Sequence, residues 1–200
     1  MRNIILASTS PRRRELMELL RLPFTAVGAD YEEDMSLDLS PEDLVAHLAL
    51  GKAQAVAKDY ADALVIGGDT IVVHDGTLLG KPYTSEKARE MLQSLRGATH
   101  QIMTGLAVID TKTGETRQAV SVSDLRFRDY TDEEIENYLQ TGEPFDRAGA
   151  YALQGYASLF AQEIRGDYYS ILGLSVVELR KILDEFGIDV WEGILGIEHG

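Results

Sequence analysis

A chain of 200 residues with 44% hydrophobic and 26% charged side chains suits one folded domain, or two small lobes that share a core. Its formal net charge of −14 argues against a nucleic-acid polymer or an anionic membrane as partner, so an anionic ligand would need a local positive site. The absence of cysteine excludes disulfides and thiolate metal sites and fits a cytoplasmic protein.

The apolar stretch near the N-terminus covers only residues 4–7, which is too short for the core of a signal peptide. No uncharged apolar run approaches the length of a membrane span. We therefore expect a soluble, cytoplasmic protein.

Segments rich in β-branched residues alternate with helical patterns, which predicts the α/β class. Strands are expected at 3–7, 101–110 and 119–128, and in the stretch LVIGGDTIVVHDGTLLGKP, where Asp75-Gly76 predicts a hairpin. Helices are expected at 11–20, 41–60, 85–95 and 174–186, and another begins after Thr131 with Ile135, Tyr138 and Leu139 as its apolar stripe. Ser10, Ser40 and Thr131 are the expected N-caps of three of them. Residues 142–173 are expected to mix short strands and loops, and residues 187–200 to be loosely ordered.

Three consecutive arginines, Arg12, Arg13 and Arg14, lie at the start of the first predicted helix, in the stretch LASTSPRRRELM. Positive side chains at that end of a helix cost stability unless a negative group offsets them. A bound phosphate would be stabilised by the backbone N–H groups, the helix dipole and the guanidinium groups, with Ser8 and Ser10 as further donors. The pattern leaves open whether the arginines bind an anion, pair with carboxylates of the protein or face solvent.

Two more polar residues fall in apolar surroundings. Lys52 lies on the inward face of the second predicted helix, four residues after Leu48, so it either extends to the surface or projects into a polar pocket. Asp69 follows two glycines in a buried strand pattern, where an aspartate commonly binds metal, acts as a base or caps a turn. Neither pattern decides between these alternatives alone.

Other motifs exclude some chemistries. GTLLGKP has three residues between its glycines where a P-loop has four, and Pro82 stands where a serine or threonine should bind magnesium, so Lys81 is a candidate phosphate contact or an ordinary surface lysine. The acidic run around Glu33 either faces solvent or supplies oxygens to a divalent metal that carries phosphate. The four histidines lack metal-ligand spacing and no Gly-x-Ser-x-Gly motif occurs, so we expect neither a zinc site nor a serine hydrolase.

Taken in chain order, these motifs together resemble the Maf family of nucleoside triphosphate pyrophosphatases. The resemblance runs from about residue 4 to residue 186, with motifs in matching order and spacing throughout. It rests on LASTSPRRRELM, an acidic pair near residue 33, GKAQAV around Lys52, GGDTIV, LGKP, THQIMTG, GEPFDRAGAYALQG and GDYYSILGL.

The resemblance implies a single α/β domain over residues 1–186, related to the inosine triphosphatase group, with two lobes around an elongated mixed sheet and a central cleft. Residues 187–200 would then form a C-terminal tail. It also implies hydrolysis of a nucleoside triphosphate to the monophosphate and pyrophosphate with a divalent cation, Mg²⁺ or Mn²⁺. Asp69 would be the proton acceptor and, with Glu33, a metal ligand. Four residues would bind the substrate: Ser8, Arg13, Lys52 and Lys81.

Three positions divide the family by substrate. The group that hydrolyses dTTP and UTP carries arginine, threonine and glutamine, whereas the 7-methyl-GTP group carries tryptophan, glutamine and glutamate. This chain has Arg12, Thr70 and Gln154, so the resemblance implies the dTTP/UTP group. The chain departs from the family pattern at a few positions near the motifs: Gly68, Ser175 and Tyr156-Ala157.

Two other function classes stay open at this point. The protein could be a nucleotide-binding regulator of cell division with little turnover, since the family name refers to septum formation, or a phosphatase that releases one phosphate at a time. Asp69, Glu33 and both lysines favour catalysis, which could cleanse the nucleotide pool of modified pyrimidines. The family also implies a homodimer, with no membrane or nucleic-acid partner.

Overall fold

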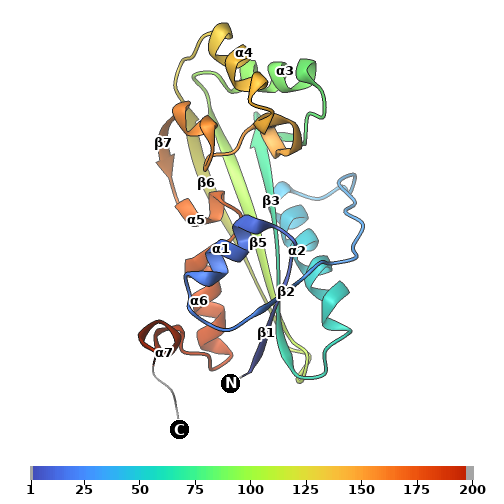
Figure 1. The fold of residues 1–200 in the computed structure, drawn as a ribbon. Coiled ribbons are helices and arrows are strands. Elements are labelled where there is room, and N and C mark those ends of the chain that lie inside the picture. The colour runs from blue at the N-terminus through green and yellow to red at the C-terminus, as the bar shows by residue number, and fades with distance from the viewer. Residues whose placement is uncertain (1, 197–200) are drawn as a thin grey trace. The chain divides into compact units, whose positions relative to one another are not determined.

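The computed structural model describes residues 2–196 and confirms the predicted α/β class. Within that range seven strands form one mixed sheet, in the order β2-β1-β3-β5-β6-β7 with β4 paired to β3 (Figure 1). β1 runs parallel to β2 and to β3, whereas β4 and β7 run antiparallel to β3 and β6. The strands span Asn3–Ala7 (β1), Thr25–Val27 (β2), Ala63–His74 (β3), Thr77–Leu79 (β4), Thr99–Asp110 (β5), Thr116–Phe127 (β6) and Ala161–Arg165 (β7).

The helices alternate with these strands along the chain, and none in residues 2–196 is both long and apolar enough to cross a bilayer. The α-helices span Pro11–Glu18 (α1), Pro41–Ala57 (α2), Ser85–Leu95 (α3), Asp132–Gln140 (α4), Tyr168–Ile171 (α5), Val176–Glu185 (α6) and Val190–Leu195 (α7). Three 3₁₀ helices span Glu143–Asp146 (η1), Ala148–Ala150 (η2) and Tyr156–Leu159 (η3).

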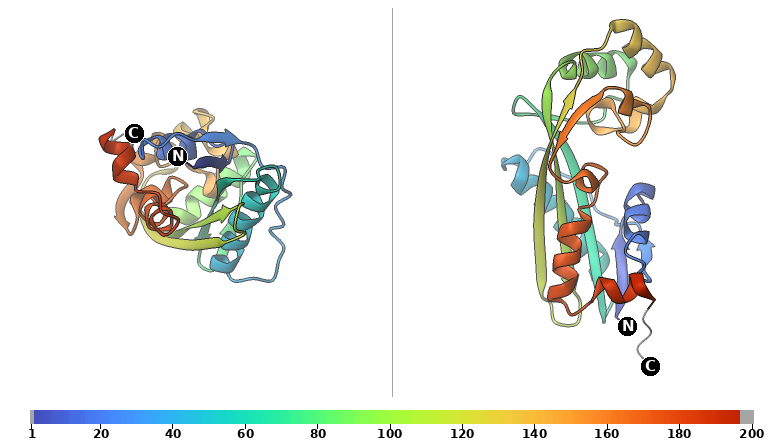
Figure 2. Two further views of the ribbon diagram at one scale, coloured as in Figure 1. Left: turned by 90° about the horizontal axis from the view of Figure 1, so that it is seen from below. Right: turned by 90° about the vertical axis from the view of Figure 1, so that its left-hand side faces the viewer.

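The chain divides into two compact units, and each is built from separate stretches of sequence. The first consists of Met1–Thr70, Thr104–Ser121 and Gly173–Gly200, and the second of Ile71–Met103 and Val122–Leu172. β3, β5 and β6 therefore contribute residues to both units. In the second unit α3 and α4 lie side by side (Figure 2).

The predicted helix starts are confirmed by their N-caps. Ser10 and Ser40 each accept a hydrogen bond from the backbone N–H three residues further on, and proline occupies the first helical position after both. Thr131 and Glu134 form a complete capping box at the start of α4. The cap at Ser10 fixes the residue at which α1 begins, and with it the place of Arg13 in the first turn.

The hairpin at Asp75-Gly76 is confirmed, because both residues have positive φ angles of 47° and 73° between β3 and β4. The prediction missed β2, whose three residues are too few to show an alternating pattern. Residues 142–173 contain three 3₁₀ helices and α5 besides the one short strand, β7.

The prediction also differs at the C-terminal end, where the sequence indicates loose order and the structure has the helix α7. Asp189 caps this helix through the N–H of Trp191. Gly193 has no room for a side chain, because a Cβ atom there would approach Leu22 closer than 3.0 Å. α7 thus lies against the segment that follows α1 (Figure 2). Residues 197–200 of the predicted tail lie outside the described residues.

In the second unit, His100 is part of the core. It is buried among aromatic rings, and its Nε2 lies 2.8 Å from the hydroxyl oxygen of Tyr151. Burial lowers the pKa of His100 from its ordinary 6.5 to about 3, with a smaller contribution from the charge of His74. The imidazole is therefore a neutral part of the core at physiological pH.

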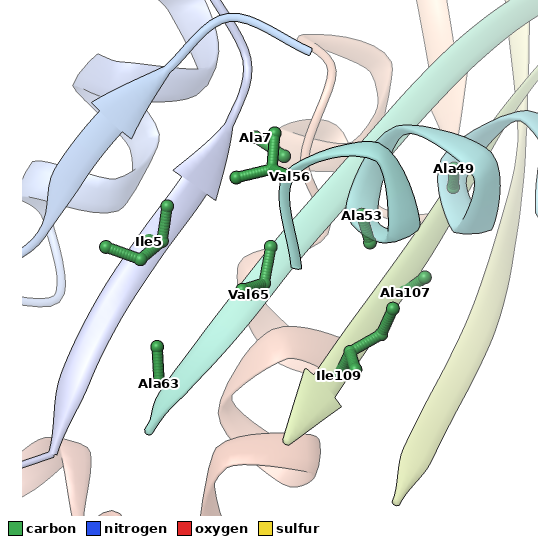
Figure 3. Packing of buried hydrophobic residues seen from close by; sticks show 9 residues of the cluster. All are labelled: Ile5, Ala7, Ala49, Ala53, Val56, Ala63, Val65, Ala107 and Ile109. Atoms are coloured by element: carbon green, nitrogen blue, oxygen red, sulfur yellow. The ribbon is translucent and has the colours of Figure 1, made fainter. Parts of the chain in front are cut away.

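Two glycines let α2 lie directly on the sheet of the first unit. A Cβ atom at Gly67 in β3 would approach the backbone of Ala49 and Ala53 closer than 3.0 Å, and one at Gly105 in β5 would do the same to Val45. Hydrogen atoms at these positions thus allow an unusually close contact between helix and strands. The buried cluster at this contact consists mainly of small and β-branched residues (Figure 3): Ile5, Ala7, Ala49, Ala53, Val56, Ala63, Val65, Ala107 and Ile109.

This close packing predicts the effect of Gly105→Ala. The new methyl group would meet the backbone carbonyl of Val45, which cannot rotate away as a side chain can, so we expect the free energy of unfolding to fall by about 1–3 kcal/mol. Urea unfolding followed by circular dichroism measures the change. Gly80→Ala is the matched control, because a Cβ atom there meets nothing within 4 Å. Equal unfolding midpoints for the two variants would contradict the close contact.

Candidate functional site

Lys52, Glu33 and Asp69 form an ionic centre in the first unit, and we call these three residues the charged triad. The Nζ atom of Lys52 lies 2.6 Å from Oε1 of Glu33 and 2.6 Å from Oδ1 of Asp69. The side chains of Lys52 and Asp69 are only 13% and 11% exposed, whereas that of Glu33 is 46% exposed. Two carboxylates thus share one largely buried ammonium group, whose positive charge offsets their mutual repulsion.

The charged triad decides two alternatives that the sequence leaves open. Lys52 does not extend to the surface but projects from α2 onto the carboxylates. Asp69 lies inside β3 and so does not cap a turn. The glycine contacts of α2 with β3 and β5 account for the geometry, since they bring the helix backbone close enough for Lys52 to reach Asp69.

Arg13 occupies a second part of the first unit, beside the charged triad. Its Nε donates a hydrogen bond of 2.8 Å to the carbonyl oxygen of Gly173, and its Nη1 and Nη2 lie 3.4 Å from the hydroxyl oxygens of Ser8 and Thr70. Among residues 2–196, no carboxylate lies within 4.0 Å of this guanidinium group. Its charge is thus held by neutral oxygen atoms alone.

The electrostatics of Arg13 favour an anion. Burial lowers the pKa of Arg13 from its ordinary value, and the negative charges of Asp69 and Glu33 oppose this shift. The group stays protonated, because an arginine side chain is not deprotonated in proteins. The two long contacts leave the guanidinium group with unused hydrogen-bonding capacity, which a phosphate oxygen could satisfy.

The start of α1 supplies further donors and explains the three arginines. Ser8 is buried, and its Oγ accepts a hydrogen bond of 3.2 Å from the N–H of Ser10. Arg13 turns inward, Arg14 is exposed, and Arg12 is partly exposed on the same turn. Of the three alternatives for this cluster, solvent exposure holds for Arg14. Arg13 instead points onto neutral oxygen atoms, and its binding of an anion stays a prediction.

Two residues of this region escaped the sequence analysis. Thr104 is 1% exposed, and its hydroxyl lies 3.0 Å from that of Thr70 across the β3–β5 pair. Gly173 has a φ angle of 118° and presents its carbonyl oxygen to Arg13. The motif THQIMTG contains Thr104 and GDYYSILGL contains Gly173, but no local pattern indicates which residue of a motif faces the site.

The other predicted site residues belong to the second unit. Nζ of Lys81 lies 2.6 Å from Oδ1 of Asp146, in an ion pair whose side chains are 46% and 80% exposed. Gln154 is exposed in the loop before η3. The first unit therefore brings together Ser8, Arg13, Glu33, Lys52, Asp69 and Thr70, whereas Lys81 and Gln154 stand in surroundings of their own.

Glu33 and Asp69 could hold a divalent metal together with a ligand. Among the described residues, no group of three or more His, Asp and Glu side chains gathers to bind a metal unaided. Mg²⁺, however, is usually bound by one or two carboxylates, with water and substrate phosphates as its other ligands. The carboxylate oxygens of Glu33 and Asp69 lie at most twice 2.6 Å apart through the Lys52 ammonium, so this donor set fits such an ion.

Known proteins resemble this chain in fold and in sequence. The Ham1 proteins of Staphylococcus aureus and Coxiella burnetii have a similar fold, with TM-scores of 0.51 and 0.53 at 13% and 16% sequence identity; the alignments cover 93% and 92% of this chain and 100% of each structure. A dTTP/UTP pyrophosphatase of Bacillus cereus is 47% identical over 190 residues, and one of Bacillus anthracis is 46% identical; both alignments cover 95% of this chain and 98% of the relative.

Fold and site thus define an α/β protein with the Ham1 fold and a buried centre of cationic and acidic side chains. The family profile described as Maf-like protein matches residues 3–186. The chain belongs to the Maf family.

The neutral surroundings of Arg13 predict weaker anion binding after Arg13→Lys. Lysine has a compact ammonium group and cannot reproduce the planar fork that bridges Ser8, Thr70 and Gly173, so we expect the dissociation constant for inorganic pyrophosphate to rise about tenfold or more. Isothermal titration calorimetry measures it. Arg14→Lys, an exposed change on the same helix, should leave the constant within about twofold. An equal change in both variants, or an unchanged constant in Arg13→Lys, would contradict a specific role for the guanidinium fork of Arg13.

Proposed function

We propose that this protein is a nucleoside triphosphate pyrophosphatase that hydrolyses dTTP and UTP to the monophosphate and pyrophosphate. Membership of the Maf family and the names of its relatives, dTTP/UTP pyrophosphatase, support this activity. The observation that carries it is the charged triad beside Arg13, which combines a base, an ammonium group and an anion-binding fork in one unit.

The phosphate chain is the part of the substrate that these side chains suit. Arg13 and Ser8 offer donors to the phosphate oxygens, and the backbone N–H groups of the first turn of α1 add a positive dipole end. Lys52 neutralises charge that shifts toward the leaving pyrophosphate, and Lys81 is proposed as a further phosphate contact.

Asp69 is the proposed proton acceptor. Its carboxylate takes a proton from water while the water oxygen forms a bond to the α-phosphorus and the bond to the bridging α,β-oxygen breaks. The electron pair of the broken bond leaves with pyrophosphate, whose charge the lysines offset. Lys52 orients Asp69 through the hydrogen bond of 2.6 Å from Nζ to Oδ1. A divalent cation such as Mg²⁺ or Mn²⁺, held by Glu33 and Asp69, would neutralise phosphate charge and acidify the attacking water.

Three residues are proposed to set the preference for pyrimidines: Arg12, Thr70 and Gln154. The amide of Gln154 is both a donor and an acceptor, so it can pair with the O4 and N3–H edge of uracil or thymine. A base with donors and acceptors reversed would leave that amide unpaired. The hydroxyl of Thr70 contacts both Arg13 and Thr104, which fixes its position next to Asp69.

Asp69→Asn tests this mechanism. The variant loses the proton acceptor but keeps the size of the side chain, so we expect kcat for UTP with Mg²⁺ to fall about 10²–10⁴-fold while much nucleotide binding remains. Asp75→Asn, at a 90% exposed carboxylate in the neighbouring hairpin, is the matched control and should keep its rate. Near-normal turnover in Asp69→Asn would overturn the role of this residue.

The products of the wild-type protein test the reaction itself. Pyrophosphate released in equal amount to UMP or dTMP is the expected result, measured by anion-exchange chromatography of the reaction mixture. Orthophosphate would instead identify a phosphatase, and the absence of any product would favour a nucleotide-binding regulator.

A further inference from the structure

We propose that Glu143 is a positioning residue for Gln154, and that selectivity for the base depends on the contact of its carboxylate with the Gln154 loop, residues 152–157. The inference rests on the proposed function in one respect, the assignment of base recognition to Gln154. Glu143 and the whole Gln154 loop belong to the second unit.

The carboxylate of Glu143 holds the C-terminal side of the loop. Its Oε2 accepts a hydrogen bond of 3.1 Å from the N–H of Tyr156, and its Oε1 one of 3.4 Å from the N–H of Ala157. These two residues begin the helix η3, which has no side-chain cap from its own N-cap residue. Glu143, 13 residues earlier in the chain, therefore takes the place of a local cap.

Tyr138 extends the same contact to the N-terminal side of the loop. Its hydroxyl donates a hydrogen bond of 2.7 Å to Oε1 of Glu143 and accepts one of 3.3 Å from the N–H of Ala152. Burial raises the pKa of Tyr138, and the hydrogen bond to Glu143 adds to this effect, so the hydroxyl remains a donor. Backbone groups on both sides of Gln154 are thus tied to one carboxylate.

Gly155 shows how closely the carboxylate approaches. A Cβ atom at this position would lie closer than 3.0 Å to all three carboxyl atoms of Glu143. The φ angle of Gly155 is −104°, which lies outside the left-handed region, so the space that Glu143 occupies, and not a positive φ, is what excludes a side chain here. In the pair Gln154-Gly155, the first residue exposes its amide and the second leaves room for the carboxylate of Glu143.

The side chain of Gln154 is exposed, whereas the loop that carries it is anchored on both sides. Leu153 and Ala157 are 8% and 0% exposed and anchor the loop in the unit, whereas Gln154 is exposed between them. Base recognition requires the amide to meet a base edge within hydrogen-bond distance, so a loop that shifts loses discrimination before it loses phosphate binding.

Glu143→Gln and Gly155→Ala disturb this contact from its two sides. Glutamine has one acceptor where glutamate has two, so it cannot serve Tyr138, Tyr156 and Ala157 together. Alanine at position 155 displaces the carboxylate without changing it. The readout is the ratio of dissociation constants for non-hydrolysable α,β-methylene analogues of CTP and UTP, because cytosine presents a donor and an acceptor where uracil presents O4 and N3–H; this ratio does not depend on turnover.

We expect the preference for the UTP analogue to fall about fivefold to tenfold in each variant, with faster amide hydrogen exchange at Tyr156 and Ala157. In the double variant the two effects should not add, because each removes the same contact. Glu134→Gln is the matched control: it weakens the capping box of α4 in the same unit, so it should lower stability and leave the ratio unchanged.

A wild-type ratio in Glu143→Gln and in Gly155→Ala would overturn the inference, as would a wild-type protein that binds both analogues equally. An equal loss of selectivity in Glu134→Gln would also overturn it, because general destabilisation would then explain the effect. A protein that discriminates between the analogues in the expected way but releases no pyrophosphate would contradict the proposed function and leave the role of Glu143 intact.

Discussion

The structure of the first unit depends on one ionic contact, the ammonium group of Lys52 between the carboxylates of Glu33 and Asp69. Placing an aspartate inside a buried strand costs solvation energy that only a close opposite charge can offset. The glycines of β3 and β5 permit this contact, because they let α2 approach the sheet until its lysine reaches across. The glycines of β3 and β5 thus determine both how α2 packs on the sheet and how Lys52 contacts Asp69.

Arg13 lies beside the charged triad but forms no ion pair with its carboxylates. If its guanidinium group formed an ion pair with Asp69, its donors would be occupied and could not bind an external anion. The structure keeps Arg13 on the neutral oxygens of Ser8, Thr70 and Gly173 while Lys52 serves the carboxylates. Lys52 therefore contacts both carboxylates, and Arg13 keeps hydrogen-bond donors for an external anion.

Local chemistry is what the sequence predicts well. Ser10, Ser40 and Thr131 cap helices because the capping bond joins residues three positions apart, and Asp75-Gly76 makes a hairpin for an equally local reason. The motifs of LASTSPRRRELM and GGDTIV likewise identify the segments that contribute to the site, because unusual residues in an apolar pattern stand out.

Contacts between distant residues are what the sequence hides. Arg13 and Gly173 are 160 positions apart, so no window of sequence contains both. The position of Thr104 behind Thr70, and that of Glu143 behind Gln154, follow from strand pairing and loop packing. The short strand β2 was missed because three residues show no period. The motifs thus indicate which residues matter before the fold explains how each one acts.

The most direct measurement of the central claim is the rate of pyrophosphate release from UTP by Lys52→Met. Methionine keeps the unbranched side chain but removes the charge between Glu33 and Asp69, so the account predicts a loss of at least about 100-fold in kcat in a protein that still folds, as circular dichroism would show. Lys58→Met, an exposed change at the end of the same helix, should keep its rate. A folded Lys52→Met variant with near-normal turnover would contradict the claim that Asp69 needs its contact with Lys52 to act as the proton acceptor.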